Sequence, residues 1–214
     1  ENGVTIKSEE WGIVGDIGVI DGVEYTIVSL SELRNMISNK DDLSKVVTTK
    51  ITSMSSLFSR SRFSRDGLGN WEDISSWDVS NVTNMNGMFE YNQYLDIDIT
   101  YWDTSNVTSM YRMFLGTRDL DIEVDLSSLD VSSVKDMNRM FSGSSFNGDI
   151  SNWDVSNVTN MEYMFSNGGN PNTQVYFNQD LSSWNVTNVT VCFGFYSGNL
   201  VWTLPKPNFT NCTQ

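Results

Sequence analysis

The chain has 214 residues, of which 39% are hydrophobic and 12% aromatic, and its formal net charge is −14. This composition supports a folded core and excludes a disordered chain. The negative charge disfavours nucleic acid and anionic membrane surfaces as partners. The apolar runs are too short for membrane insertion. The chain has no histidine, which removes the commonest general base and the commonest transition-metal ligand.

Residues 1–45 predict an N-terminal cap. Asp21 and Gly22 lie between two apolar runs, a pattern typical of a β-hairpin. Ser29 and Glu32 follow with the spacing of a capping box, which predicts that a helix begins there. We expect the hairpin and the helix to cover the open end of the region that follows.

Residues 46–196 consist of six copies of one repeat. The nine residues "WDVSNVTNM" occur at positions 77–85 and again at 153–161. Alignment on the valine after "SN" gives intervals of 25, 27, 24 and 31 residues, which are typical of stacked repeats. The aligned positions are Val82, Val107, Val134, Val158 and Val189, with Ile51 in a degenerate first copy.

Each repeat predicts a short strand and a short helix. The segment "EDISSW" at 72–77 alternates polar and apolar residues as a strand does. Val82, Met85, Met88 and Phe89 follow at offsets of 0, 3, 6 and 7, which place them on one face of a helix. Because no single repeat can bury this face, the repeats are expected to stack around a shared core. The predicted fold class is α/β, a solenoid with a cap at each end.

Residues 197–214 predict the C-terminal cap. Pro205 and Pro207 are expected to prevent further strand pairing. Cys192 in the last repeat and Cys212 in the tail are 20 residues apart, a spacing that suits a disulfide fastening this end. Such a bond implies an oxidising compartment; two free buried thiols are the alternative.

Two stretches, "FNGDISNWDVSNVTNMEYMF" at 146–165 and "FNQDLSSWNVTNV" at 177–189, resemble the repeats of BspA-like leucine-rich-repeat surface proteins. That group includes a family of unknown function first noted in mycoplasma lipoproteins. The resemblance implies a right-handed leucine-rich-repeat-like solenoid, a bacterial source, secretion or display at the cell surface, and a role in adhesion or protein binding. It supplies no catalytic residues. Because the chain begins with Glu1, we expect it to be a processed protein or part of a larger surface protein.

A column of aspartates precedes the tryptophan position of the repeats. We expect either that each carboxylate accepts hydrogen bonds within a turn or that the column binds Ca²⁺; no other cofactor is predicted. These candidate ligand-binding or metal-binding residues are Asp73, Asp98, Asp125, Asp149 and Asp180. A second column, for which turn hydrogen bonds are expected, consists of Asp78, Asp103, Asp130, Asp154 and Asn185.

Aromatic residues form two further sets. One column is expected to pack in the core, because Leu129 takes the same position and cannot offer an aromatic face; stacking on a sugar is the alternative. Tyrosines between the repeats are candidate binding residues, or they cover the edge of the core. The column is Trp77, Trp102, Trp153 and Trp184, and the tyrosines are Tyr91, Tyr94, Tyr101 and Tyr176.

Seven N-x-[ST] triplets are present, five of them produced by the repeat itself. They carry glycans only in a host that glycosylates exported asparagines. Their asparagines are Asn81, Asn106, Asn157, Asn185, Asn188, Asn208 and Asn211.

These patterns predict a non-catalytic recognition or adhesion module, at the cell surface or secreted, that binds a protein or a glycan through its repeats. The repeated aspartates are near-equivalent, so nothing separates one acid from one base as a hydrolase requires. The alternatives are a passive structural spacer and a Ca²⁺-stabilised solenoid with no ligand of its own.

Overall fold

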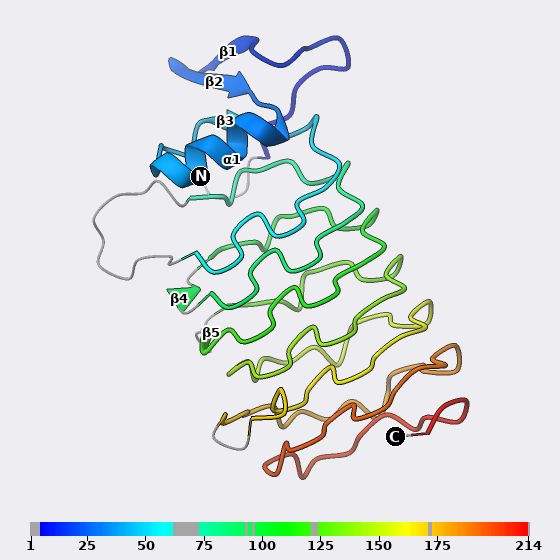
Figure 1. Cartoon of the computed structure of the whole chain (residues 1–214). Coiled ribbons are helices and arrows are strands. Elements are labelled where there is room, and N and C mark those ends of the chain that lie inside the picture. The colour runs from blue at the N-terminus through cyan, green and yellow to red at the C-terminus, as the bar shows by residue number, and fades with distance from the viewer. Residues whose placement is uncertain are drawn as a thin grey trace.

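The computed structural model has a small N-terminal sheet and helix on top of a column of stacked chain segments (Figure 1). Its elements in chain order are β1 (Ile17–Ile20), β2 (Val23–Ile27), α1 (Leu30–Asn39), β3 (Val46–Val47), β4 (Tyr94–Leu95) and β5 (Asp119–Leu120). The structure describes residues 5–61, 73–92, 94–95, 97–120, 124–170 and 173–213. Within these ranges no helix is long and apolar enough to cross a membrane.

The N-terminal sheet has the strand order β1-β2-β3. β1 and β2 pair antiparallel around Asp21 and Gly22, both of which have a positive φ as a tight hairpin turn requires. β2 also pairs in parallel with β3, the first segment of the repeat region. In α1, Ser29 and Glu32 form both hydrogen bonds of a capping box, and Leu33 is fully buried. Both elements expected in residues 1–45 are therefore present, and β3 connects them to the repeats.

Parallel bridges join each repeat to the next. They pair Ser53, Asn84, Ser109, Asp136, Asn160 and Val191 in succession. Each of these residues lies two positions after the aligned valine or isoleucine, so the structure pairs the positions that the sequence alignment pairs. The repeats follow one another down the column from the N-terminal to the C-terminal end (Figure 1). We infer that this column is a solenoid; its handedness and its relation to leucine-rich repeats remain predictions.

The prediction of a short helix in each repeat is wrong. The Met85 amide donates to the Ser109 carbonyl of the next repeat at 3.0 Å, and the Phe89 amide donates to Met113 at 2.9 Å. The amide of Met88 instead closes a turn on the Met85 carbonyl at 3.2 Å. An α-helix needs bonds from each amide to the carbonyl four residues earlier, and these amides are already used. In every repeat, the residue directly before the apolar positions at offsets 6 and 7 also has a left-handed backbone. These residues are Ser56, Gly87, Arg112, Arg139, Tyr163 and Gly194.

The predicted strand at 72–77 is also wrong for the described residues, which begin at Asp73. Its carboxylate accepts a hydrogen bond from the Ser75 amide, and the Trp77 amide donates to the Ile74 carbonyl at 3.2 Å. These two local bonds fold the segment into turns. Ile74 is nevertheless buried, as the alternating pattern predicts. The position that pairs between repeats lies further along the chain, at Asn84.

Phenylalanines form a continuous stack through the core. The ring centroids of Phe58, Phe89, Phe114, Phe141 and Phe165 are separated in turn by 5.7, 5.6, 5.6 and 5.6 Å, with interplanar angles of at most 11°. The rings are therefore near-parallel and offset, a favourable arrangement for aromatic pairs. The repeat methionines, such as Met85 and Met88, are fully buried beside them.

The tryptophan column is buried, with exposed fractions of at most 5%. Each indole N–H also bonds to a backbone carbonyl of an earlier segment. Trp102 donates to Ile74 at 3.1 Å, and Trp153 donates to Leu126 at 3.0 Å. The rings therefore connect the repeats and are not available to stack on a sugar.

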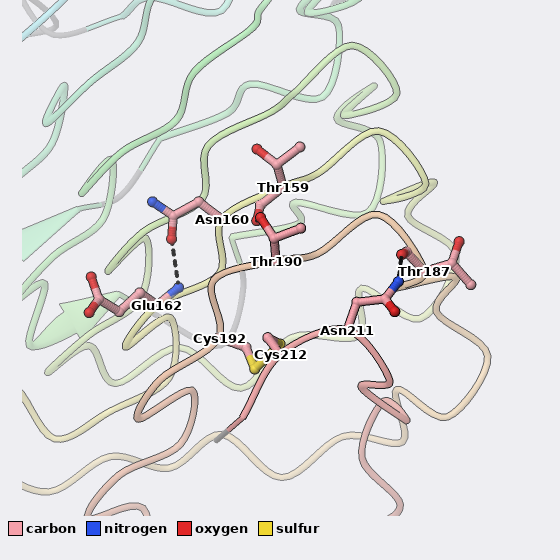
Figure 2. Close-up of a disulfide and its surroundings, with 8 residues drawn as sticks. All are labelled: Thr159, Asn160, Glu162, Thr187, Thr190, Cys192, Asn211 and Cys212. Atoms are coloured by element: carbon pink, nitrogen blue, oxygen red, sulfur yellow. Dashed lines mark hydrogen bonds between the residues drawn. A yellow bond between two sulfur atoms is a disulfide. The ribbon is translucent and has the colours of Figure 1, made fainter.

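The C-terminal tail covers the last repeat. Cys192 and Cys212 form a disulfide, with their Cα atoms 5.9 Å apart. Next to it the Asn211 side chain donates to the Thr187 carbonyl (Figure 2). The Pro205 carbonyl accepts the Leu181 amide at 3.0 Å. The tail is thus joined to the end of the column by a disulfide and by hydrogen bonds.

Candidate functional site

The first aspartate column lies on the surface, and its carboxylates are used in turns. Asp73 Oδ1 accepts hydrogen bonds from the amide and hydroxyl of Ser75 at 3.1 and 2.7 Å. The other carboxylates of the column each accept a hydrogen bond from the backbone amide two residues later; these are Asp98, Asp125, Asp149 and Asp180. Within the described residues no group of three or more Asp, Glu, Cys or His could hold a metal ion. The column therefore has the geometry of repeated turns, and the Ca²⁺ interpretation lacks a set of ligands there.

At two of these carboxylates, Asp149 and Asp180, the turn hydrogen bonds also lower the pKa. Backbone and side-chain bonds from Ser151 hold the pKa of Asp149 below its ordinary value, and bonds from the Ser182 side chain and backbone do the same for the pKa of Asp180. Hydrogen bonds to the ionised form favour that form. The turn bonds therefore favour the charged form of Asp149 and Asp180.

Asp78 in the second column is buried, with 1% of its surface exposed. Its Oδ2 accepts from the Thr49 hydroxyl at 2.7 Å, and its Oδ1 accepts from the amide and hydroxyl of Ser80 at 3.1 and 2.6 Å. Lys7 lies 3.6 Å away. Burial raises the pKa of Asp78, but the bonds from Ser80 and Thr49 outweigh it, so the pKa lies below its ordinary value. Asp78 thus fastens the first repeat to the second.

We expect Asp78→Ala to lower the free energy of unfolding by about 3 kcal/mol, because it leaves partly buried donors on Thr49 and Ser80 without an acceptor. Asp154→Ala is the matched control: Asp154 is exposed and accepts from the Ser156 amide, so a loss below about 1 kcal/mol is expected. Denaturant titrations of both variants measure the difference.

The effect of Asp78→Ala should also depend on pH. Because the folded-state pKa of Asp78 is lowered, its stabilisation is fully present above the unfolded value of about 3.9. It is lost as the pH falls through the folded value. The gap between the wild type and the variant should therefore narrow below about pH 4; a constant gap down to pH 2 would contradict the role given to the ionised carboxylate.

Asparagines of the glycosylation triplets form a ladder on the surface. The Nδ2 atoms of Asn81, Asn106 and Asn157 donate to the carbonyls of Thr49, Ser80 and Ser132 in the preceding repeat, at 2.9, 2.8 and 2.8 Å. Asn188 makes the corresponding bond to Ser156 at 2.7 Å. Nδ2 is the atom to which a glycan would be attached. The recurring "NVT" is therefore explained by hydrogen bonds between repeats.

The candidate tyrosines do not form one cluster. Tyr91, Tyr101 and Tyr176 are all about half exposed. Tyr91 lines a cleft of about 200 Å³, whereas the cleft lining does not include Tyr101 or Tyr176. The backbone of Tyr94 lies in β4, and its side chain is outside the described part of the chain.

The cleft at Tyr91 is lined by three arginines, Arg112, Arg118 and Arg139. Arg112 lies 3.6 Å from Glu90 and 4.8 Å from the Tyr111 ring centroid. Arg139 lies 4.9 Å from the Tyr163 ring centroid. The remaining lining is Leu115, Gly116, Ser142, Gly143, Asn167, Gly168, Asn170 and Thr173. The cleft is thus a basic, polar hollow on an acidic protein.

Gly116 shapes one wall of this cleft. Its φ is +68°, and a Cβ there would lie 2.4 Å from Cδ1 of Tyr91. No side chain fits at that distance, so the Tyr91 ring rests directly on the Gly116 backbone. The guanidinium carbon of Arg60 also lies 5.4 Å from the Tyr91 ring centroid, so Arg60 and Gly116 both contact the ring, while 46% of the residue remains exposed.

A family profile matches the chain three times, over residues 28–141, 61–176 and 121–205. It is described as "Mycoplasma protein of unknown function, DUF285". The chain belongs to this family. No curated protein and no solved structure matches it. The overlapping matches cover the repeat region of this DUF285 chain, which agrees with the internal repetition of its sequence.

The arginines of the cleft are functional candidates that the sequence interpretation of this DUF285 chain missed. Arg112 and Arg139 occupy the same position of neighbouring repeats, in "MYRMF" and "MNRMF". Three of the chain's 13 basic residues meet at this one cleft. The matching positions of Arg112 and Arg139 could have indicated this site in the sequence, because equivalent positions of adjacent repeats lie next to each other in the stack.

Proposed function

We propose that this DUF285 chain is a non-catalytic recognition module of the BspA-like leucine-rich-repeat type, secreted or displayed at the cell surface, that binds a protein or a glycan on its repeat surface. The observation that carries the proposal is the cleft at Tyr91. Four successive repeats contribute to it, through Tyr91, Arg112, Arg139 and Asn167.

The chemistry of the cleft supports binding. Arginine and tyrosine are enriched at recognition surfaces, where they supply planar contacts and hydrogen bonds at low conformational cost. Hydrogen bonds between the repeats hold the cleft in shape before a ligand arrives: the Tyr91 amide donates to Leu115, and the Gly116 amide donates to Ser142. A preformed site loses less entropy on binding. The disulfide supports an extracellular location, since such bonds persist in oxidising compartments.

A binding screen with a matched pair of variants tests the proposal. The full chain is labelled and applied to a glycan array and to a panel of extracellular proteins. Tyr91→Ala should weaken any saturable binding at least tenfold, while Tyr101→Ala, which removes an equally exposed ring outside the cleft (47% against 46%), should leave it unchanged. Equal effects of the two variants would place the binding elsewhere. Absence of saturable binding to any member would contradict the proposal and favour a passive spacer.

A further inference from the structure

Two arginines lie one above the other in the stack. Arg112 and Arg139 each lie five positions after the aligned valine, and their repeats are bridged at Ser109 and Asp136. The Arg112 amide donates to the Asn138 carbonyl next to Arg139, at 2.9 Å. Paired backbones in such a stack lie about 4.8 Å apart. Side chains at matching positions of adjacent repeats bring their two positive charges near one another, and like charges repel.

The backbone at both arginines is unfavourable as well. Each has a φ of 56°, and glycine takes the same position in two other repeats, as Gly87 and Gly194. This conformation is unfavourable for a non-glycine residue, because its Cβ approaches the following carbonyl oxygen. The fold therefore tolerates both stacked charge and left-handed backbone at this point, although glycine would remove both. Strain of this kind is a reason to look for a function.

The arginines keep hydrogen-bonding capacity within the described part of the chain. The Nε atom of Arg112 is buried and has no hydrogen-bond partner there. Arg112 has an ion pair with Glu90, but the distance of 3.6 Å is long for a charge-assisted hydrogen bond. Arg139 has no ion pair among the described residues and lies against the Tyr163 ring. A guanidinium presents its N–H donors in a planar fork that matches a carboxylate.

From this arrangement we infer that the cleft binds the carboxylate of an acidic sugar, with Arg112 and Arg139 as the carboxylate ligands and the exposed part of the Tyr91 side chain as a contact for the sugar. This inference rests on the proposed binding function and names the ligand class. The polar side chains of Asn167 and Thr173 line the same cleft and are suited to sugar hydroxyls.

Size and charge favour a single sugar residue. The cleft volume of about 200 Å³ is below the range of roughly 300–1,000 Å³ that holds drug-sized ligands. The net charge of −14 repels a long polyanion from most of the surface, but charges beyond the Debye length of about 8 Å are screened at physiological salt. The arginines therefore dominate the potential inside the cleft, and the acidic surroundings restrict entry to one anionic unit.

Titration of the full chain by nuclear magnetic resonance tests the inference, with glucuronate as the probe, glucose as the matched neutral sugar and acetate as the bare carboxylate. Glucuronate should bind at least tenfold more tightly than either. Arg139→Gln and Arg112→Gln should each reduce glucuronate affinity at least tenfold. Arg139→Lys keeps the positive charge but loses the planar guanidinium donors. It should therefore recover only part of the affinity that Arg139→Gln loses. Lys135→Gln makes the same change of charge at an exposed position outside the cleft and should have no effect.

Several results would overturn the inference. Glucose binding as tightly as glucuronate removes the role of the carboxylate, and acetate binding as tightly removes the role of the sugar. If the variant that combines Arg112→Gln and Arg139→Gln binds glucuronate with unchanged affinity, the cleft is not the binding site. If a glutamate-rich peptide binds through the two arginines and glucuronate does not, the ligand is a protein and the assignment to an acidic sugar is wrong. If glucuronate fails while Tyr91-dependent binding persists in the screen above, the inference is wrong and the proposed function stands.

Discussion

Replacement of Phe114 by alanine is expected to lower the free energy of unfolding by about 4 kcal/mol, the middle of the range for a buried phenylalanine. Phe114 is fully buried, and its ring centroid lies 5.6 Å from both Phe89 and Phe141. Alanine removes both ring contacts and leaves a cavity in the middle of the column. Each repeat is stabilised through its two neighbours, so the loss weakens two interfaces at once.

Thermal unfolding measures this effect. For a protein of this size, a loss of about 4 kcal/mol corresponds to a fall of roughly 8–16 °C in Tm. Phe193→Ala is the matched control, because Phe193 is 57% exposed and has an edge contact with Tyr163; a loss near 1 kcal/mol is expected. If both variants unfold at the same temperature, the phenylalanine column does not form the core.

Cys212→Ser is expected to destabilise the chain by about 3 kcal/mol, because the disulfide closes a loop with a sequence separation of 20 and restricts the unfolded chain. The native tail also loses its anchor. Contacts near the disulfide that remain are the Asn211–Thr187 hydrogen bond and the edge contact between Phe195 and Phe209. Further up the tail, the Leu181–Pro205 hydrogen bond remains, as does buried Trp202, which donates to the Gln179 carbonyl at 2.9 Å. We expect the tail to separate from the last repeat before the rest of the column unfolds.

Hydrogen exchange and denaturant titration together check this prediction. The Leu181 amide, whose acceptor belongs to the tail, should exchange faster in Cys212→Ser than in the wild type, while the Met110 amide in the middle of the column should be protected in both. A reductant should shift the wild type to the unfolding midpoint of the variant and leave the variant unchanged. An unshifted wild type would show that the bond does not restrain this end.

The phase of the repeats and the identity of the core could be predicted from the sequence. "NVTNM" keeps Val82 and Met85 in register with their equivalents, and all of these residues are buried. These core positions can be recognised in the sequence because equivalent residues of adjacent repeats pack on each other. The same residue type therefore recurs at the repeat interval. Ser29 and Glu32 predict the start of α1 for a local reason, since a capping box involves only four residues.

The local backbone could not be predicted in the same way. Offsets of 0, 3, 6 and 7 fit a helix, but successive turns place the same side chains inward. The choice is made by hydrogen bonds to the next repeat, such as Gly87 to Tyr111 at 2.8 Å, and no pattern within one repeat contains that information. The left-handed Arg112 and Tyr163 give no warning in sequence, because such residues rarely adopt this conformation.

The candidate site was only partly predictable. Tyr91 was identified by its position between repeats, whereas Arg112 and Arg139 were missed because each looks like a solvated charge on its own. The aspartate columns attracted a metal interpretation because carboxylates recur in phase. Their regularity has a simpler origin, since each Asp73-type carboxylate closes its own turn.

Nuclear Overhauser effects between repeats test the central structural claim most directly. Ser109, Asp136 and Asn160 are paired in parallel, so backbone protons near these residues should show contacts in the order 109–136–160, at distances set by a strand separation of about 4.8 Å. Contacts confined to sequence neighbours, or between these residues and positions out of phase with the repeat, would contradict the stacked arrangement.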